Sequence, residues 1–293
     1  MAESYAALGH LALNAERPAS EWLNMGDWST AQTFPTACRA LAQRLHDAAQ
    51  IPPHARILDV GHGCGDSLLM LQDRAPRCLH GVTSLEAHAR RAQVRTRPDT
   101  KVHCAEAVAW LAATTHTYDT ILALDCAYHF ADRPAFFRAA HDALAPGGTL
   151  ALVDLVAAWP YADDGADDGA FHASTLPPPT RAPSYVRTGA HRLACMLTRT
   201  PAHAFVSFDT YRAQLRAAGF DAALEMHDIS ADVFPGFAHF LQQLGTGSER
   251  LWRGGSGLQT LALHAFGRVV AQWAHGGDVG YVRCGLIVAR KRA

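Results

Sequence analysis

The sequence predicts an α/β fold, a doubly wound and mostly parallel sheet in which strands alternate with helices. Residues 57–60 form a short apolar run of the kind seen in strands buried on both faces, and a loop and a helix start follow it. Further strand-like runs at 78–84, 101–104, 118–125 and 149–155 alternate with segments of helical pattern. The length of 293 residues allows one large α/β domain, or one domain plus a cap.

The composition excludes several classes of function. The net charge is −1 with histidine neutral, so no surface for a polyanion is predicted and nucleic acid is not an expected partner. No apolar run is long enough to span a bilayer, and residues 1–15 lack the features of a signal peptide. The seven cysteines show no metal or redox spacing, so we expect reduced thiols, no metal site and a cytoplasmic protein.

Three glycines at alternate positions, Gly61, Gly63 and Gly65, follow the first strand, and Asp59 stands two residues before them. Glycine tolerates positive φ and lets a ligand approach the backbone. The following helix points free N–H groups and its positive dipole end at the loop, so we expect a binding pocket there. The dinucleotide fingerprint is excluded because its third glycine would fall on Asp66, and the P-loop is excluded because Gly-Lys-Ser/Thr is absent.

The pattern acidic-x-Gly-x-Gly-x-Gly over 59–65 resembles motif I of the class I methyltransferases that use S-adenosylmethionine. In that family the glycine loop lies against the methionine part of the cofactor, and the acidic residue orders the loop and its water around the ammonium group. A glycine-rich turn without a ligand is the alternative. A helical segment at 133–144, a Pro-Gly-Gly turn at 146–148 and then an apolar strand form a second specific match, which favours the methyltransferase.

From residue 23 onward the order of parts resembles the tocopherol, sterol and sugar O-methyltransferase-like group. The resemblance implies a seven-stranded, mostly parallel sheet with helices on both faces and a helical cap. The corresponding division of the chain is a helical lid at 1–50, a cofactor-binding core at 51–156, a loop or cap insertion over the substrate site at 157–206, and the remainder of core and cap at 207–293.

The same resemblance suggests cofactor contacts from the lid and the second strand. A Leu-Asn-x-Gly-x-Trp segment ends at Trp28 and is similar to the segment that precedes motif I in this group, which places Trp28 at the cofactor. A helix pair that merely covers the sheet is the alternative. The second strand ends in Thr83 and Ser84, where the family usually has an acidic residue that binds both ribose hydroxyls. We therefore expect these two hydroxyl side chains, or His88, to face the ribose.

The third and fourth strands supply three further candidates. The family often places an Asp after the third strand to bind the adenine amino group, and this chain has Ala105 and Glu106 there. Glu106 is the only acidic choice, and it is equally suited to capping the next helix. Asp125 follows the fourth strand, and ligands of open α/β sheets bind just beyond the carboxyl ends of such strands. We assign all three to the cofactor.

Two residues are candidates for catalysis. The sugar O-methyltransferases of this group carry a His-His-Met segment whose histidine is the general base, and Tyr128-His129-Phe130 is the match. The family's Asp in the fifth strand matches Asp154. A hydroxyl acceptor must lose its proton, and His129 has a suitable pKa range for that step. The alternatives are a packing role for His129 and a strand-end role for Asp154.

The sequence thus predicts an S-adenosylmethionine-dependent methyltransferase that acts on oxygen, nitrogen or carbon of a small, largely apolar metabolite. A second hypothesis is methyl addition to an alkene, as in cyclopropane-fatty-acid synthases, which share the Gly-Val-Thr strand. A third is a cofactor-binding pseudoenzyme whose surface serves a partner, because the ribose and adenine positions are altered. The expected partner is the small-molecule acceptor, and the expected assembly is a monomer or a homodimer.

Overall fold

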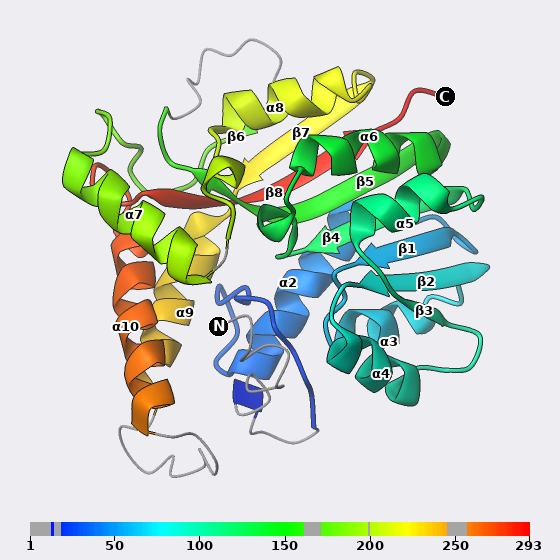
Figure 1. The fold of residues 1–293 in the computed structure, drawn as a ribbon, viewed down its shortest axis with the longest axis horizontal. Coiled ribbons are helices and arrows are strands. Elements are labelled where there is room, and N and C mark those ends of the chain that lie inside the picture. The colour runs from blue at the N-terminus through cyan, green and yellow to red at the C-terminus, as the bar shows by residue number, and fades with distance from the viewer. Residues whose placement is uncertain (1–12, 15–18, 161–170, 199, 245–256) are drawn as a thin grey trace.

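A computed structural model describes residues 13–14, 19–160, 171–198, 200–244 and 257–293 (Figure 1). Within these residues one sheet of eight strands has the order β3-β2-β1-β4-β5-β8-β7-β6. The strands are β1 (Arg56–Val60), β2 (Cys78–Thr83), β3 (Lys101–Cys104), β4 (Tyr118–Leu124), β5 (Leu144–Ala157), β6 (Phe171–His172), β7 (Ala223–Asp228) and β8 (Val282–Arg290). The order reverses at β1 and β4, so their carboxyl ends form a switch point at which ligands bind in open sheets.

The sheet is mostly parallel, as the sequence predicts. Strands β1 to β5 pair in parallel, whereas β8 runs antiparallel to both β5 and β7. The count of seven strands is wrong for the described residues, because β6 pairs with β7 and adds an eighth strand. This strand has only two residues, and its His172 ring stacks on that of His227 at 4.4 Å between centroids. A strand of two residues is too short to form an apolar run, so the sequence pattern does not reveal β6.

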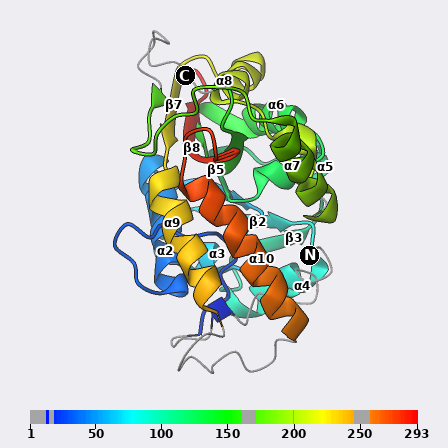
Figure 2. The same ribbon diagram turned by 90° about the vertical axis from the view of Figure 1, so that its left-hand side faces the viewer.

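Helices cover both faces of the sheet, which confirms the doubly wound class. One hydrophobic core includes residues of the first group of helices and a second core includes residues of the other group. The first group is α2 (Phe34–Ala48), α3 (Asp66–Gln72), α4 (Glu86–Arg95), α9 (Ser230–Gln243) and α10 (Gly257–Ala274). The second group is α5 (Ala107–Ala113), α6 (Arg133–Ala143) and α8 (Phe208–Ala217). Figure 2 shows α9 and α10 lying side by side.

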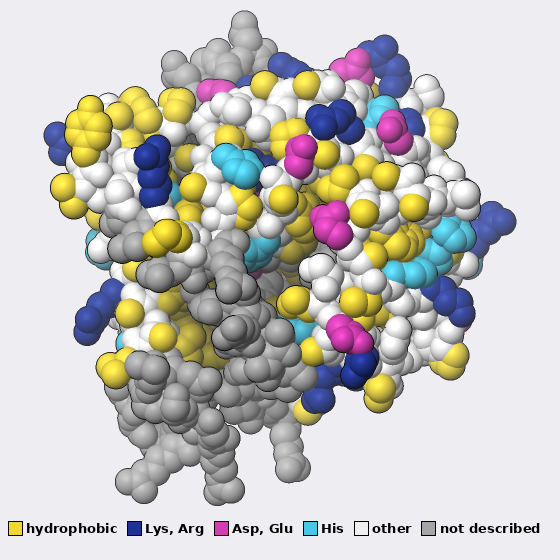
Figure 3. All heavy atoms as spheres, viewed as in Figure 1, with side chains coloured by type: hydrophobic (Ala, Val, Ile, Leu, Met, Phe, Trp, Pro, Cys, Tyr) yellow, Lys and Arg dark blue, Asp and Glu magenta, His cyan; other side chains and the backbone are white. Residues whose placement is uncertain are grey.

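The segment at 157–206, predicted as a loop or cap insertion, contains the helix α7 (Tyr185–Thr198) and the short 3₁₀ helix η3 (Ala202–Ala204). Tyr185 and Val186 are exposed in the first turn of α7, and hydrophobic side chains show at the upper left of Figure 3 where this helix lies. Residues 161–170, which hold the four aspartates of the predicted loop, lie outside the described residues. So do residues 1–12 and 15–18 of the predicted lid.

Three further observations bear on the predictions from composition. No helix within the described part of the chain is long and apolar enough to cross a membrane. The seven cysteines are all free, in agreement with the expectation of reduced thiols. On the face in Figure 3, the Lys and Arg side chains are scattered and do not form one basic patch.

Candidate active site

A cavity of about 460 Å³ lies at the carboxyl ends of β1, β2 and β4, where the order of the strands reverses. Its size falls in the range of small-molecule sites. The structure brings eight of the predicted site residues together in its wall, and they lie at or just after the ends of β1, β2, β3 and β4. They are Gly61, Gly63, Thr83, Ser84, Ala105, Glu106, Asp125 and His129.

The glycine loop needs its glycines because other segments approach its backbone. All three have positive φ, at 73° for Gly61, 56° for Gly63 and 97° for Gly65. A Cβ atom on Gly61 would lie 2.5 Å from the sulfur of Cys126, and one on Gly63 would lie 2.8 Å from the Leu23 side chain. Gly65 precedes α3 and packs against α4, and it does not line the cavity. Gly61 and Gly63 thus shape the cavity wall, whereas Gly65 supports it.

Asp59, at the acidic position of motif I, is a buried carboxylate that forms no close hydrogen bond with the described residues. Its side chain is 1% exposed, and neither oxygen has a hydrogen-bond partner among the described residues. It lines a small pocket of about 30 Å³ that shares Gly61 and Gly63 with the main cavity. Burial raises its pKa to about 7, and the nearby Ser67 hydroxyl only partly opposes this shift. Such a buried, unsatisfied acceptor beside the loop fits an ordered water or a cationic group of a ligand.

The walls at β2 and β3 contain one acidic side chain, and it already has a role in the fold. Thr83 and Ser84 line the cavity together with His88, as expected from the altered end of β2. Glu106 also lines it, but its Oε2 accepts a hydrogen bond from the backbone N–H of Ala109 at 3.0 Å and caps α5. The predicted role of Glu106 as a helix cap is therefore confirmed for one of its oxygens. The side chain also borders the cavity.

The lid reaches the cavity through residues that sequence analysis did not single out. Leu23 and Asn24 line the cavity, whereas Trp28 does not. The Trp28 ring packs against α9, where it lies 5.6 Å from the Phe240 ring and so close to Gly236 that a Cβ there would clash. The placement of Trp28 at the cavity is therefore wrong in this structure. The Leu-Asn pair of the same recognisable segment occupies that place instead.

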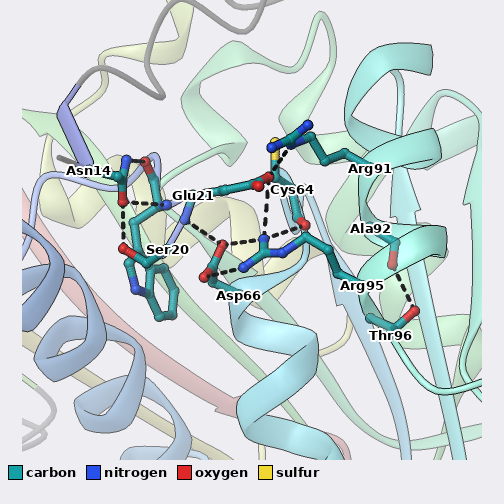
Figure 4. A network of polar contacts seen from close by, with 10 residues as sticks. Asn14, Ser20, Glu21, Cys64, Asp66, Arg91, Ala92, Arg95 and Thr96 are labelled. Carbon is teal, nitrogen blue, oxygen red and sulfur yellow. Dashed lines mark hydrogen bonds and ion pairs between the residues drawn. The ribbon is translucent and has the colours of Figure 1, made fainter. Parts of the chain in front are cut away.

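Ionic contacts fasten the lid to the glycine loop and to α4 (Figure 4). The backbone N–H of Glu21 donates to the Asp66 carboxylate at 3.1 Å. Arg95 binds the same carboxylate with two hydrogen bonds of 2.7 and 2.8 Å and also donates to the carbonyl of Cys64 at 2.8 Å. Arg91 pairs with the Glu21 side chain at 2.5 Å. These contacts hold the lid beside the loop that borders the cavity.

Asp125 projects from the end of β4 with an unusual backbone conformation. Its φ of 54° lies in the left-handed region, which is uncommon for residues other than glycine and more frequent for Asp. One carboxylate oxygen accepts a hydrogen bond from the backbone N–H of Met25 at 2.8 Å. Burial raises the pKa of Asp125 to about 7, and the negative charge of Asp154 adds to this effect.

His129 ends the 3₁₀ helix η2 (Ala127–His129), directly after β4. Its ring borders the cavity, and its Nδ1 lies 3.4 Å from the hydroxyl of Thr200. Desolvation by the surrounding protein lowers the pKa of His129 to about 4, although the residue as a whole is exposed. His129 is therefore neutral at physiological pH, which is the form that can accept a proton.

Asp154 does not join the other predicted residues in the cavity wall. Its side chain is 0% exposed and belongs to the interior of β5. It accepts a hydrogen bond from Arg133 at 3.1 Å and another from the Tyr211 hydroxyl at 2.9 Å. The expectation that Asp154 touches the reactants is not met by this geometry, because neighbouring side chains already bind its carboxylate.

Known proteins resemble this chain in sequence. Residues 31–225 match the family described as methyltransferase domain. Erythromycin 3''-O-methyltransferase of Saccharopolyspora erythraea is 30% identical over 205 residues, which are 68% of this chain. The aligned part spans only 61% of that relative's own length.

Solved structures share the fold at low sequence identity. A putative sarcosine dimethylglycine methyltransferase from Galdieria sulphuraria has a TM-score of 0.70 and 14% identity, with 99% of this chain and 98% of that chain covered. A cyclopropane synthase from Mycobacterium tuberculosis has a TM-score of 0.66 and 17% identity, with 98% and 95% covered. The fold class is thereby confirmed. The match over residues 31–225 confirms the predicted methyltransferase, and the chain belongs to the methyltransferase domain family.

Proposed function

We propose that this chain transfers a methyl group from S-adenosylmethionine to a hydroxyl of a small, largely apolar metabolite, with His129 as general base. The observation that carries the proposal is the position of His129. Its neutral ring lies in the wall of the same cavity as the glycine loop and the ends of β2 and β3. One cavity therefore offers both a place for the donor and a proton acceptor.

The residues that would hold the donor fit its chemistry. Asp59 offers an unsatisfied carboxylate beside the glycine loop, suited to water around an ammonium group. Thr83 and Ser84 offer hydroxyls for the ribose, and Ala105 and Glu106 border the expected place of the adenine. When bound, S-adenosylmethionine supplies an electrophilic methyl group. Holding both reactants in line contributes up to about 7–11 kcal/mol in favourable cases.

His129 takes the proton of the acceptor hydroxyl in this proposal. The Thr200 hydroxyl lies 3.4 Å from Nδ1, and in the tautomer whose Nδ1–H donates to this hydroxyl, Nε2 is the proton acceptor. An acceptor amine or activated carbon would need no base. The relative named erythromycin 3''-O-methyltransferase favours a hydroxyl acceptor, and Phe130 and Leu124 give the cavity the apolar wall that an apolar metabolite requires.

Incubation with S-adenosylmethionine that carries a trideuterated methyl group tests this function. The purified chain and the labelled donor are added to a panel of hydroxylated macrocycles, glycosides, amines and unsaturated fatty acids. A product that retains all three deuterium atoms supports methyl transfer, and fragmentation identifies the oxygen. A cyclopropane product would retain only two, because one methyl hydrogen is lost on ring closure. A protein that binds S-adenosylhomocysteine but labels nothing, even in whole-cell extract, would favour the pseudoenzyme hypothesis.

Three further predictions remain proposals. The division of the chain is a lid at 1–50, a core at 51–156, an insertion at 157–206 and a C-terminal part at 207–293. The lid is supported by the hydrogen bonds of Glu21 to Asp66 and of Met25 to Asp125. The predicted assembly is a monomer or a homodimer, which light scattering after gel filtration tests. The predicted location is the cytoplasm, which a fluorescent fusion in the source cell tests.

A further inference from the structure

The short segment that carries His129 is anchored from below by one buried side chain. Asp154 lies under η2 and binds groups at two points of this segment. The Arg133 guanidinium, at the first residue of α6, donates to the Asp154 carboxylate at 3.1 Å. A hydrogen bond from the backbone of Tyr128 also acts on Asp154 and lowers its pKa, against the larger raising effect of burial. His129 therefore lies between two anchored positions.

The anchor is closed to solvent. Arg133 is 2% exposed, and Asp154 and Tyr211 are 0% exposed. The Tyr211 hydroxyl donates to the same oxygen of Asp154 at 2.9 Å, and the Arg133 guanidinium lies over the Tyr211 ring at 4.3 Å. Removing one partner of such a buried pair leaves a charge without compensation, which strongly disturbs the local structure. The cluster of Asp154, Arg133 and Tyr211 therefore holds its geometry only while all three side chains are present.

We propose that Asp154 is a positioning residue for methyl transfer. It fixes the segment from Tyr128 to Arg133 so that the His129 ring stays in the cavity wall, and it does so without touching the reactants. The Thr200 hydroxyl also contacts this ring, 3.4 Å from its Nδ1. The inference rests on the proposed function only in naming His129 as the base. The anchoring itself is a property of the folded chain and is measured without an acceptor.

Nuclear magnetic resonance of protein labelled at histidine Cε1 tests the anchor. His129→Gln identifies the His129 signal by its absence. The wild-type signal is expected to titrate well below the ordinary histidine value of about 6.5, because the cavity wall lowers its pKa to about 4. In Asp154→Asn, which keeps an oxygen that can accept a hydrogen bond but loses the negative charge that pairs with Arg133, the midpoint is expected to rise by one unit or more. Tyr211→Phe removes only a hydroxyl and is expected to give a smaller shift in the same direction.

Tyr118→Phe is the matched control. Its hydroxyl is also in the interior, at 2.7 Å from the Nδ1 of His80, but that pair lies on β2 and β4 away from η2. This variant is expected to lose comparable stability and to leave the His129 midpoint unchanged. If Asp154→Asn does not fold, Tyr211→Phe alone decides the question. A folded variant with the wild-type His129 titration overturns the inference.

The two proposals fail in distinguishable ways. If the midpoint moves in Asp154→Asn while His129→Gln retains normal labelling of an identified acceptor, the anchor is real and His129 is not the base. If the midpoint stays fixed while His129→Gln loses turnover, His129 is the base and Asp154 is only a part of the core. Binding of S-adenosylhomocysteine by Asp154→Asn, measured by calorimetry, serves as the check that the glycine loop is intact.

Discussion

The backbone N–H of Met25 donates to the carboxylate of Asp125 at 2.8 Å and joins the lid to the end of β4. A second attachment joins Glu21 to Asp66 at the start of α3, on the other side of the glycine loop. Leu23 and Asn24, which line the cavity, lie between these two points. The lid is thus held at both sides of the stretch that lines the cavity, and displacing this stretch requires release of at least one attachment.

Arg95→Gln is predicted to weaken the lid and with it the binding of S-adenosylhomocysteine, by about tenfold. Arg95 binds Asp66 through two charge-assisted hydrogen bonds with both side chains largely buried, and a tenfold change corresponds to about 1.4 kcal/mol. Calorimetry measures the affinity. Arg90→Gln is the control on the same helix, because Arg90 forms an exposed pair with Glu86 and such pairs contribute little. Equal affinities of the two variants would show that the Arg95–Asp66 contact does not contribute to binding.

Gly63→Val is predicted to abolish donor binding. A valine at a φ of 56° is strained, and its Cβ would lie 2.8 Å from the Leu23 side chain and displace the lid. Gly189→Ala is the control, because a Cβ atom at that position meets no atom within 4 Å. Circular dichroism establishes that both variants fold, and calorimetry with S-adenosylhomocysteine compares them. Wild-type affinity of Gly63→Val would mean that the donor binds elsewhere.

The features of the fold that the sequence predicts correctly are those that depend on residues close together in the chain. The glycines of motif I have positive φ, and the runs that precede and follow them form β1 and α3, because these features need only neighbouring residues. The sequence assigns Trp28 to the cavity because the segment is recognisable, but the direction of its ring depends on contacts with Gly236 and Phe240, more than 200 residues away. Asp154 is a similar case, since only the fold shows that Arg133 and Tyr211 enclose it.

The acid stability of the protein is predicted to depend on His80. This side chain is 5% exposed and packs edge-on against His116, and burial lowers its pKa to about 4. The unfolded chain binds a proton near pH 6.5 and the folded chain only near pH 4, so stability falls as pH decreases through this window. Protonation of His80 is expected to lower the free energy of unfolding by about 1–3 kcal/mol at the acid end of this window.

His80→Gln should therefore flatten the decrease in melting temperature between pH 6.5 and 4, relative to the wild type. The comparison between variants is needed because Asp59 and Asp125, whose pKa values are raised to about 7, contribute a slope of the opposite sign. His239→Gln, at an exposed position of α9, is the control and should keep the wild-type slope. An unchanged slope in His80→Gln would show that other groups govern the acid transition.

The pH dependence of turnover distinguishes His129 from Asp125, two of the groups in the cavity wall that can take a proton. His129 has a pKa lowered to about 4 by burial, whereas burial raises that of Asp125 to about 7. The profile of kcat/KM reports the ionisations of the free enzyme. With His129 as the base, activity toward the acceptor found by isotope labelling rises with pH near 4 and is level from pH 6 to 8.

His129→Gln should lower turnover by about 10²–10⁴ at all these pH values. Asp125→Asn, which retains an oxygen for the Met25 N–H, should keep most activity. The opposite pattern, a rise near pH 7 that Asp125→Asn abolishes and His129→Gln preserves, would transfer the role of base to Asp125.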